Sequence, residues 1–311
     1  MIIKTGIIPR VAFEVFGVEI YWYAVLIVSA MVLGLLWFKI HDGRFGIRFD
    51  DIIDFALFVI PISIICARIY YVVFSLDYFI DNPTEIFQIK NGGLAIYGGI
   101  IGGVITIVIM GKIKKIKILD ITDFIAPVLA LAQSIGRWGN YINVEAYGYE
   151  TNLPIKMEII ENGVIKYVHP TFLYESVGTF TIFIILAILS KKRKFSGEIT
   201  YIYIICYSFI RFIIEGLRTD SLMFFNCRIS QILSLVLFIV FSIILIYNKN
   251  KNKQMSKCVE KRRWKVEQNI DKYSFFVDEY SKNMVSYIYI QMRQAHIVKK
   301  EWWLYVRRRN L

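Results

Sequence analysis

The residues of this chain best suited to chemistry lie between Gly136 and Gly148, directly after an apolar run. This stretch carries Arg137, Asn140 and Glu145. Charged groups at membrane depth cost a few kcal/mol each, so their presence usually marks a functional site. The alternative is the polar end of a transmembrane helix, because an arginine near the interface often only extends toward water.

A second polar group lies further along the chain, where Tyr207, Arg211, Glu215 and Arg218 are separated by four, four and three positions. This spacing places all four on one helical face. Such a face in an otherwise apolar helix should point into the protein. An internal ion-pair ladder is the structural alternative.

Arg137 and Arg211 together suit a phosphate, because a guanidinium stays charged and can grip two phosphate oxygens at once. We expect Glu145 and Glu215 to hold these arginines while the site is empty, and Asn140 to donate to the ligand. The two polar groups therefore predict a site for an anionic lipid headgroup, reached sideways from the outer leaflet.

His169 precedes an apolar stretch, and the chain has only two other histidines, His41 and His296. A lone histidine at a membrane interface is either structural or a proton acceptor, since imidazole titrates near neutral pH. The sequence contains no Ser-His-Asp order, zinc-ligand spacing or phosphate-binding glycine loop. We expect neither a metal nor a cofactor.

The composition assigns the chain to the helical membrane proteins. It has 311 residues, of which 56% are hydrophobic, and a mean hydropathy of +0.51, values too apolar for a soluble domain. The net charge of +12 does not indicate a nucleic-acid partner, because residues 251–311 alone hold 15 Lys and Arg against 6 Asp and Glu. The four cysteines form no CxxC pair and read as packing residues.

Seven apolar stretches predict an all-α integral membrane protein with about seven transmembrane helices. The stretches are Ile20 to Phe38, Ile52 to Phe74, a third from near Leu94, Ile118 to Ile135, Phe172 to Leu189, Ile199 to Glu215, and Ile229 to Tyr247.

Glycines mark two local features. Gly98 and Gly102, and then Gly99 and Gly103, are spaced four apart in the third stretch, which predicts close packing against another helix. Asn162-Gly163 predicts the turn of a β-hairpin in the long loop after the fourth stretch.

The loop charges predict the orientation. Lys and Arg gather in the loops after the first, third, fifth and seventh stretches, which the positive-inside rule places in the cytoplasm. The N-terminus and a small loop domain are then extracytoplasmic, and the C-terminus is cytoplasmic. We divide the chain into a membrane domain, 1–248, and a basic tail, 249–311, whose first residues read as a disordered linker.

Five stretches in this order along the chain resemble the motifs of the prolipoprotein diacylglyceryl transferase family. The resemblance covers about residues 15 to 248. The stretches are Ala67 to Tyr71, Gly92 to Gly99, Gly136 to Gly148, His169 to Glu175, and Arg211 to Leu222.

The resemblance implies a seven-helix inner-membrane enzyme with its N-terminus outside. Its reaction would move the diacylglyceryl group of phosphatidylglycerol to the lipobox cysteine thiol of a preprolipoprotein, which releases glycerol 1-phosphate. It further implies that Arg137 binds the lipid headgroup and that Arg211 is a second essential cation. The other expected phosphatidylglycerol-binding positions are Arg68, Asn140, Tyr207, Glu215 and Arg218.

One position departs from the family. Many members have histidine where this chain has Tyr97, and a phenol, which ionises near pH 10 in water, is a poor base. Either Tyr97 only positions the lipid, or the proton acceptor lies elsewhere, with His169 and Glu145 as candidates. We leave the base unassigned.

Two other functions remain open from the sequence. A transporter or flippase for anionic lipid would explain the arginines, but should show internal repeats, which we do not find. A non-catalytic phospholipid-binding protein is the other. We expect a multi-pass protein of the bacterial cytoplasmic membrane, with its site toward the extracytoplasmic leaflet and with phosphatidylglycerol, a preprolipoprotein signal peptide and the bilayer as partners.

Overall fold

The computed structural model describes residues 1–88, 92–219, 223–224 and 227–278. The chain divides into two compact units, Met1–Asn248 and Lys249–Leu311. The helices are α1 (Trp22–Ile40), α2 (Phe49–Val73), α3 (Leu76–Asp81), α4 (Ile96–Ile113), α5 (Ile118–Asn143), α6 (Thr171–Ser190), α7 (Glu198–Leu217) and α8 (Ile229–Asp278), with two short 3₁₀ helices, η1 (Arg44–Gly46) and η2 (Pro83–Phe87).

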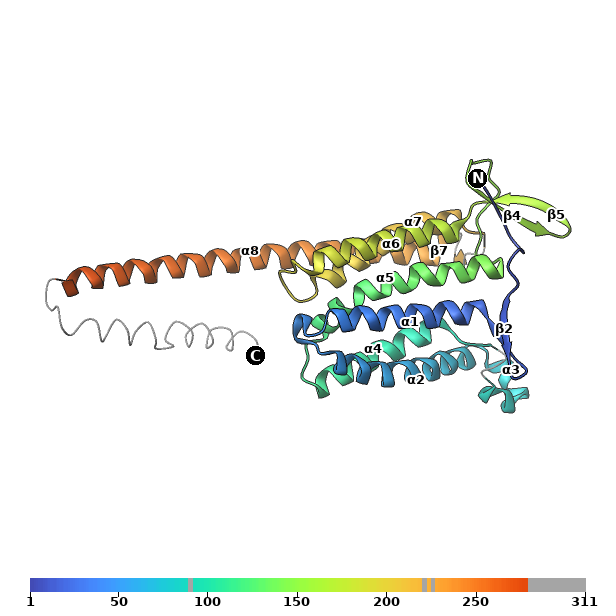
Figure 1. Cartoon of the computed structure of the whole chain (residues 1–311), viewed down its shortest axis with the longest axis horizontal. Coiled ribbons are helices and arrows are strands. Elements are labelled where there is room, and N and C mark those ends of the chain that lie inside the picture. Colours follow the sequence, from blue (N-terminus) through green and yellow to red (C-terminus); the bar gives the residue numbers. More distant parts are fainter. Residues whose placement is uncertain (89–91, 220–222, 225–226, 279–311) are drawn as a thin grey trace. The chain divides into compact units, whose positions relative to one another are not determined.

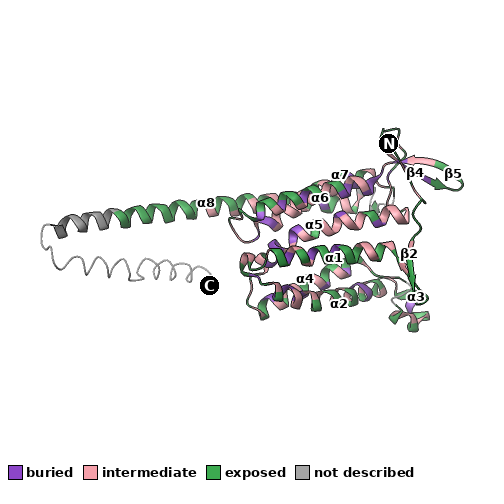
Figure 2. Cartoon of the chain, viewed as in Figure 1, coloured by how far each residue is buried: buried purple, intermediate pink, exposed green. Residues whose placement is uncertain are grey.

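Seven helices of the described chain are long and apolar enough to cross a membrane: α1, α2, α4, α5, α6, α7, and α8 over Ile229–Glu267. The predicted all-α, seven-span architecture is thereby confirmed. In the first unit α1, α2, α4, α5, α6 and α7 lie side by side (Figure 1). These helices carry many exposed residues (Figure 2). Large apolar side chains such as Leu57 and Ile105 are among them, as expected where helices contact lipid.

Helix α5 is longer than the sequence predicted, because it continues past Ile135 to Asn143. The extra two turns carry the polar stretch, whose side chains find partners on α6 and in the following loop. The helix ends where Val144 adopts a left-handed conformation, with φ of 56°, and the Glu145 N–H donates to the Asn140 carbonyl at 3.0 Å. This is a common way to satisfy the last carbonyls of a helix.

The glycine pairs of α4 pack against α2, as predicted. A Cβ atom added to Gly98 would lie against the Cys66 carbonyl oxygen and 2.9 Å from the Ala67 Cα, and one on Gly102 would lie 2.7 Å from the Cys66 Cβ. The missing side chains therefore let two helix backbones approach closely.

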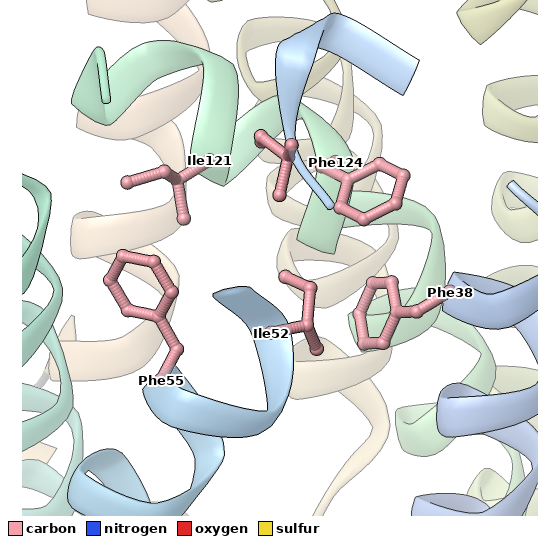
Figure 3. Packing of buried hydrophobic residues seen from close by; sticks show 6 residues of the cluster. Phe38, Ile52, Phe55, Ile121 and Phe124 are labelled. Atoms are coloured by element: carbon pink, nitrogen blue, oxygen red, sulfur yellow. The ribbon is translucent and has the colours of Figure 1, made fainter. Parts of the chain in front are cut away.

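One end of the bundle is held by an apolar cluster and by ion pairs. Phe38, Ile52, Phe55, Ile121 and Phe124 from α1, α2 and α5 are buried together (Figure 3). Lys114, just after α4, lies 2.9 Å from Asp51 and 2.5 Å from Asp54 of α2. Its hydrogen bonds with Asp54 and then Asp51 raise the pKa of the Lys114 ammonium.

Asp123 of α5 is fully buried at the same end. It accepts hydrogen bonds from Arg193 at 2.9 Å and from the backbone N–H groups of Gly197 and Thr200. These contacts fix the α6–α7 connection against α5.

The opposite end of the bundle carries the strands (Figure 1). They are β1 (Ile2–Lys4), β2 (Val11–Val15), β3 (Val18–Tyr21), β4 (Lys156–Glu161), β5 (Val164–Val168), β6 (Met223–Phe224) and β7 (Cys227–Arg228). Strand β1 pairs in parallel with β4, which pairs antiparallel with β5. The β4–β5 turn is Asn162-Gly163, with φ of 52° and 78°, so the predicted hairpin is confirmed.

The start of the tail differs from expectation. Residues 248–253, predicted to be a disordered linker, are helical within α8. Lysine, at every second position here, is a good helix former although asparagine is a weaker one, and a helix that is already nucleated extends at little cost. Arg263 and Glu267, one turn apart, lie 3.3 Å from each other. The remainder of the tail, 279–311, lies outside the described residues.

We expect Gly98→Ala to lower the free energy of unfolding by about 1–3 kcal/mol, because the new methyl group meets immovable α2 backbone. Gly99→Ala on the same helix is the control, since its Cβ would sit at ordinary distances of 3.7 and 3.8 Å. Thermal unfolding in detergent measures both. Equal melting temperatures for the two variants would contradict the close approach at Gly98.

Candidate active site

Three helices bring the polar residues together near the strand-bearing end of the bundle. Arg137 lies in the last two turns of α5, Arg211 in the last two turns of α7, and Glu175 in the second turn of α6. Each of these helices packs against the other two. The two polar groups found in the sequence therefore meet, and α6 supplies the residue between them.

Glu175 connects the two arginines. Its Oε1 lies 2.5 Å from Nη2 of Arg137, and its Oε2 lies 3.4 Å from Nη1 of Arg211. The Tyr207 hydroxyl donates to the same Oε1 at 3.4 Å. The Glu175 side chain is 2% exposed, whereas those of Arg137 and Arg211 are 22% and 17% exposed. The arginines thus face outward from a carboxylate that is out of contact with solvent.

Arg211 is held by a second buried carboxylate. Glu215, four residues later on α7, places Oε2 at 2.5 Å from Nη2 of Arg211 and is itself 2% exposed. This contact is an ion pair rather than a well-directed hydrogen bond. It agrees with the expectation that Glu215 holds an arginine.

Glu145 reaches Arg137 only indirectly. Arg137 donates to the Asn140 side-chain oxygen at 3.3 Å, and the amide nitrogen of Asn140 donates to Glu145 at 2.8 Å. Asn143 also donates to Glu145, at 3.3 Å. Glu145 is exposed and lies beyond the end of α5, which differs from the direct pairing that we expected.

Arg218 does not continue the helical face of Tyr207, Arg211 and Glu215. Helix α7 ends at Leu217, and Arg218 is extended, with φ of −77° and ψ of 148°. It forms a β-bridge with Gly148, and the Tyr149 N–H donates to the Leu217 carbonyl at 2.9 Å. The helix ends here because the last helical carbonyl, that of Leu217, accepts a hydrogen bond from the loop after α5.

His169 lies where the same loop meets α6. Its carbonyl accepts from the Gly148 N–H and its own N–H donates to the Tyr149 carbonyl, both at 3.0 Å. Its Nδ1 atom is buried and has no hydrogen-bond partner within the described part of the chain. The backbone contacts favour a structural role, while the unpartnered nitrogen keeps a proton-accepting role open.

Tyr97 lies in the first turn of α4 and is 44% exposed. Its ring is 6.4 Å from that of Tyr70 on α2. The hydroxyl has no hydrogen-bond partner among the described residues, so no contact in this part of the chain assigns it a part in proton transfer.

The guanidinium of Arg68 forms hydrogen bonds with backbone carbonyl groups. It donates to the carbonyls of Glu85, Ile86, Gly92 and Gly93 at 2.6 to 2.9 Å. Four such bonds fix the loop that precedes α4. They favour a positioning role over the direct phosphate contact that we expected for Arg68.

Two charged residues of this region were missed in the sequence. Glu175 ends the His169 to Glu175 motif, which suggested no role for this carboxylate. The signal for it is that two arginines in apolar helices each need a carboxylate partner, and Glu175 is a carboxylate within an apolar stretch. Arg228, just before α8, donates to the Glu215 carbonyl oxygen and, at 2.9 Å, to the Tyr149 hydroxyl. No spacing in the sequence links Arg228 to these partners.

Residues 10–247 match the family described as prolipoprotein diacylglyceryl transferase. The chain belongs to this family. It is 48% identical over 244 residues to the phosphatidylglycerol–prolipoprotein diacylglyceryl transferase of Clostridioides difficile, a match that covers 78% of this chain and 97% of the relative. The proteins of the same name from Finegoldia magna and Clostridium novyi are 47% and 46% identical, over 81% and 79% of this chain and 99% and 98% of each relative.

Family membership and the seven apolar helices make the chain a multi-pass membrane transferase. The matched region ends at residue 247, so the tail from 249 lies outside it. Of the motif Arg211 to Leu222, residues 220–222 lie outside the described residues.

We expect Arg68→Lys to destabilise the protein by about 1–3 kcal/mol, because a compact ammonium cannot replace a fork of donors to four carbonyls. Thermal unfolding in detergent measures the change. Arg48→Lys at the other end of α2 is the control, since that side chain is 74% exposed and surface pairs contribute little. Wild-type stability of Arg68→Lys would contradict the loop-holding role.

Proposed function

We propose that this protein transfers the diacylglyceryl group of phosphatidylglycerol to the cysteine thiol of a prolipoprotein, the first step of lipoprotein maturation. The observation that carries the proposal is the convergence of Arg137 and Arg211 on Glu175 from three helices. The names of the relatives supply the two substrates.

Arg137 and Arg211 would bind the lipid phosphate. Each terminal guanidinium nitrogen carries two hydrogens, so donors remain beyond those used on Glu175, Glu215 and Asn140. Both arginines are partly exposed, which leaves these donors accessible. Asn140 and Tyr207 would contact the glycerol and phosphate oxygens.

The reaction would exchange one bond for another at the diacylglyceryl carbon. The cysteine sulfur attacks this carbon, a C–S bond forms, and the C–O bond to phosphate breaks. The phosphate leaves as glycerol 1-phosphate with one additional negative charge. Fixed guanidiniums directed at the charge that develops on the leaving group lower the barrier, by about 3 kcal/mol for a single such donor.

The thiol proton has to leave before or during the attack, because the thiolate is the nucleophile. The positive arginines favour the thiolate, and we keep His169 and Glu145 as candidate acceptors. The unpartnered Nδ1 of His169 supports the first of these.

The orientation that we propose places the strands and the arginines on the extracytoplasmic side of the bacterial cytoplasmic membrane. The basic loops at the other end of the bundle support it through the positive-inside rule. Phosphatidylglycerol would then reach the site from the outer leaflet, and the signal peptide would present its lipobox cysteine there.

We expect the purified protein, given phosphatidylglycerol and a synthetic lipobox peptide, to produce a diacylglyceryl adduct that mass spectrometry detects. A peptide with serine in place of cysteine should give none, because a hydroxyl is a far weaker nucleophile than a thiolate. Arg137→Ala should abolish the adduct in protein that still inserts and folds. Failure of folded wild-type protein to form the adduct would favour a lipid-binding or transport function.

We expect Tyr97→Phe to keep the rate of transfer within about twofold of wild type, because the hydroxyl has no hydrogen-bond partner among the described residues. The same assay, run at several phosphatidylglycerol concentrations, separates turnover from binding. A loss of about 100-fold or more in kcat would assign the hydroxyl a part in proton transfer.

A further inference from the structure

We propose that Glu175 is a positioning residue, which holds Arg137 and Arg211 at a fixed separation for one phosphate and makes the empty site electrically neutral. This inference rests on the proposed function, because it concerns the phosphate of the same lipid donor.

Glu175 is the one described side chain that pairs with both arginines. Glu215 pairs with Arg211 alone, and Glu145 reaches Arg137 through Asn140. Without a shared carboxylate, two guanidiniums on separate helices repel each other, and long flexible side chains would move apart. Glu175 therefore determines how rigidly the two cations are held toward a single phosphate.

The exposed fractions place Glu175 behind the arginines. Its side chain is 2% exposed, against 22% for Arg137 and 17% for Arg211. A ligand from the membrane meets the guanidiniums first and has no access to the carboxylate. Glu175 thus acts through the arginines and does not compete for the same donors.

The surroundings of Glu175 are fixed by hydrogen bonds at the adjacent position. Ser176 and Ser134 exchange bonds between α6 and α5, each hydroxyl donating to the other residue's carbonyl at 2.9 Å. Trp138 donates its indole N–H to the Ser176 hydroxyl at 3.1 Å. The carboxylate is consequently carried by a helix that is locked to α5 one residue away, which makes it a rigid support.

The charges of the four side chains that pair directly with one another balance when the site is empty. Arg137 and Arg211 contribute two positive charges, and Glu175 and Glu215 contribute two negative charges. Glu175→Gln would leave the four side chains with one net positive charge, while the side chain at position 175 keeps nearly the same shape. An anion should then bind as well as before or better, although the arginines lose the support that orients them. Turnover should therefore fall, while the affinity for an anion is retained or rises.

The test uses the full-length protein in detergent, with glycerol 1-phosphate as the anionic probe and short-chain phosphatidylglycerol with a lipobox cysteine peptide for turnover. For Glu175→Gln we expect kcat to fall about 100-fold, the size of effect that misplacement of catalytic groups produces. The dissociation constant for glycerol 1-phosphate should stay equal or fall by up to about tenfold.

Two further variants separate positioning from stability. Glu175→Asp keeps the charge on a shorter arm, so kcat should fall about tenfold with probe affinity unchanged, and it carries the test if Glu175→Gln does not fold. Asp123→Asn removes another buried carboxylate, which lies 14 residues before Arg137 and therefore about 21 Å from it along α5, and folded protein should keep wild-type values.

The inference is overturned if folded Glu175→Gln keeps kcat within about threefold of wild type, or if turnover and probe affinity fall together. Absence of transfer by the wild-type protein would reject the proposed function instead. The affinity of Glu175→Gln for glycerol 1-phosphate would still decide whether this carboxylate controls the charge of the site.

Discussion

The structure depends on compensating guanidinium charge inside an apolar bundle. A buried ion whose partner is removed costs several kcal/mol, so each arginine of the site needs a carboxylate at a defined place. Glu175 and Glu215 supply these charges from α6 and α7, and both are almost completely buried. The packing of α5, α6 and α7 combines this charge pairing with a buried apolar cluster that the same three helices share.

The chain uses its arginines in two distinct ways. Arg68 and Arg228 donate to backbone carbonyls and hold loops and helix ends at the strand-bearing end of the bundle. Arg137 and Arg211 instead pair with carboxylates, which leaves other donors of each guanidinium directed outward. The first use satisfies backbone carbonyl groups of loops and helix ends. The second leaves donors that would bind an anion under the proposed function.

A neutral but polarised site suits the proposed chemistry better than a strongly basic one. A large excess of positive charge would bind the anionic donor and the anionic product alike, and uniform binding does not accelerate the chemical step. Guanidiniums that buried carboxylates hold in place instead stabilise the negative charge that develops in the transition state. The rigid contact between Ser134 and Ser176 serves this fixation.

The sequence by itself determined the class, the number of spans, the glycine-mediated contact of α4 and the hairpin at Asn162-Gly163. These features are local, since they depend on apolar length or on the backbone freedom of single residues. It also selected Arg137 and Arg211, because charge is rare in apolar helices.

Only the tertiary structure decided which partner each charge has. Arg68 donates to loop carbonyls, and Arg218 lies beyond the helix in a β-bridge with Gly148. Glu145 contacts Arg137 only through Asn140. Glu175 took the central place, 38 and 36 positions from its two partners. Spacing along one helix cannot reveal such pairs, because they depend on how α5, α6 and α7 turn toward one another.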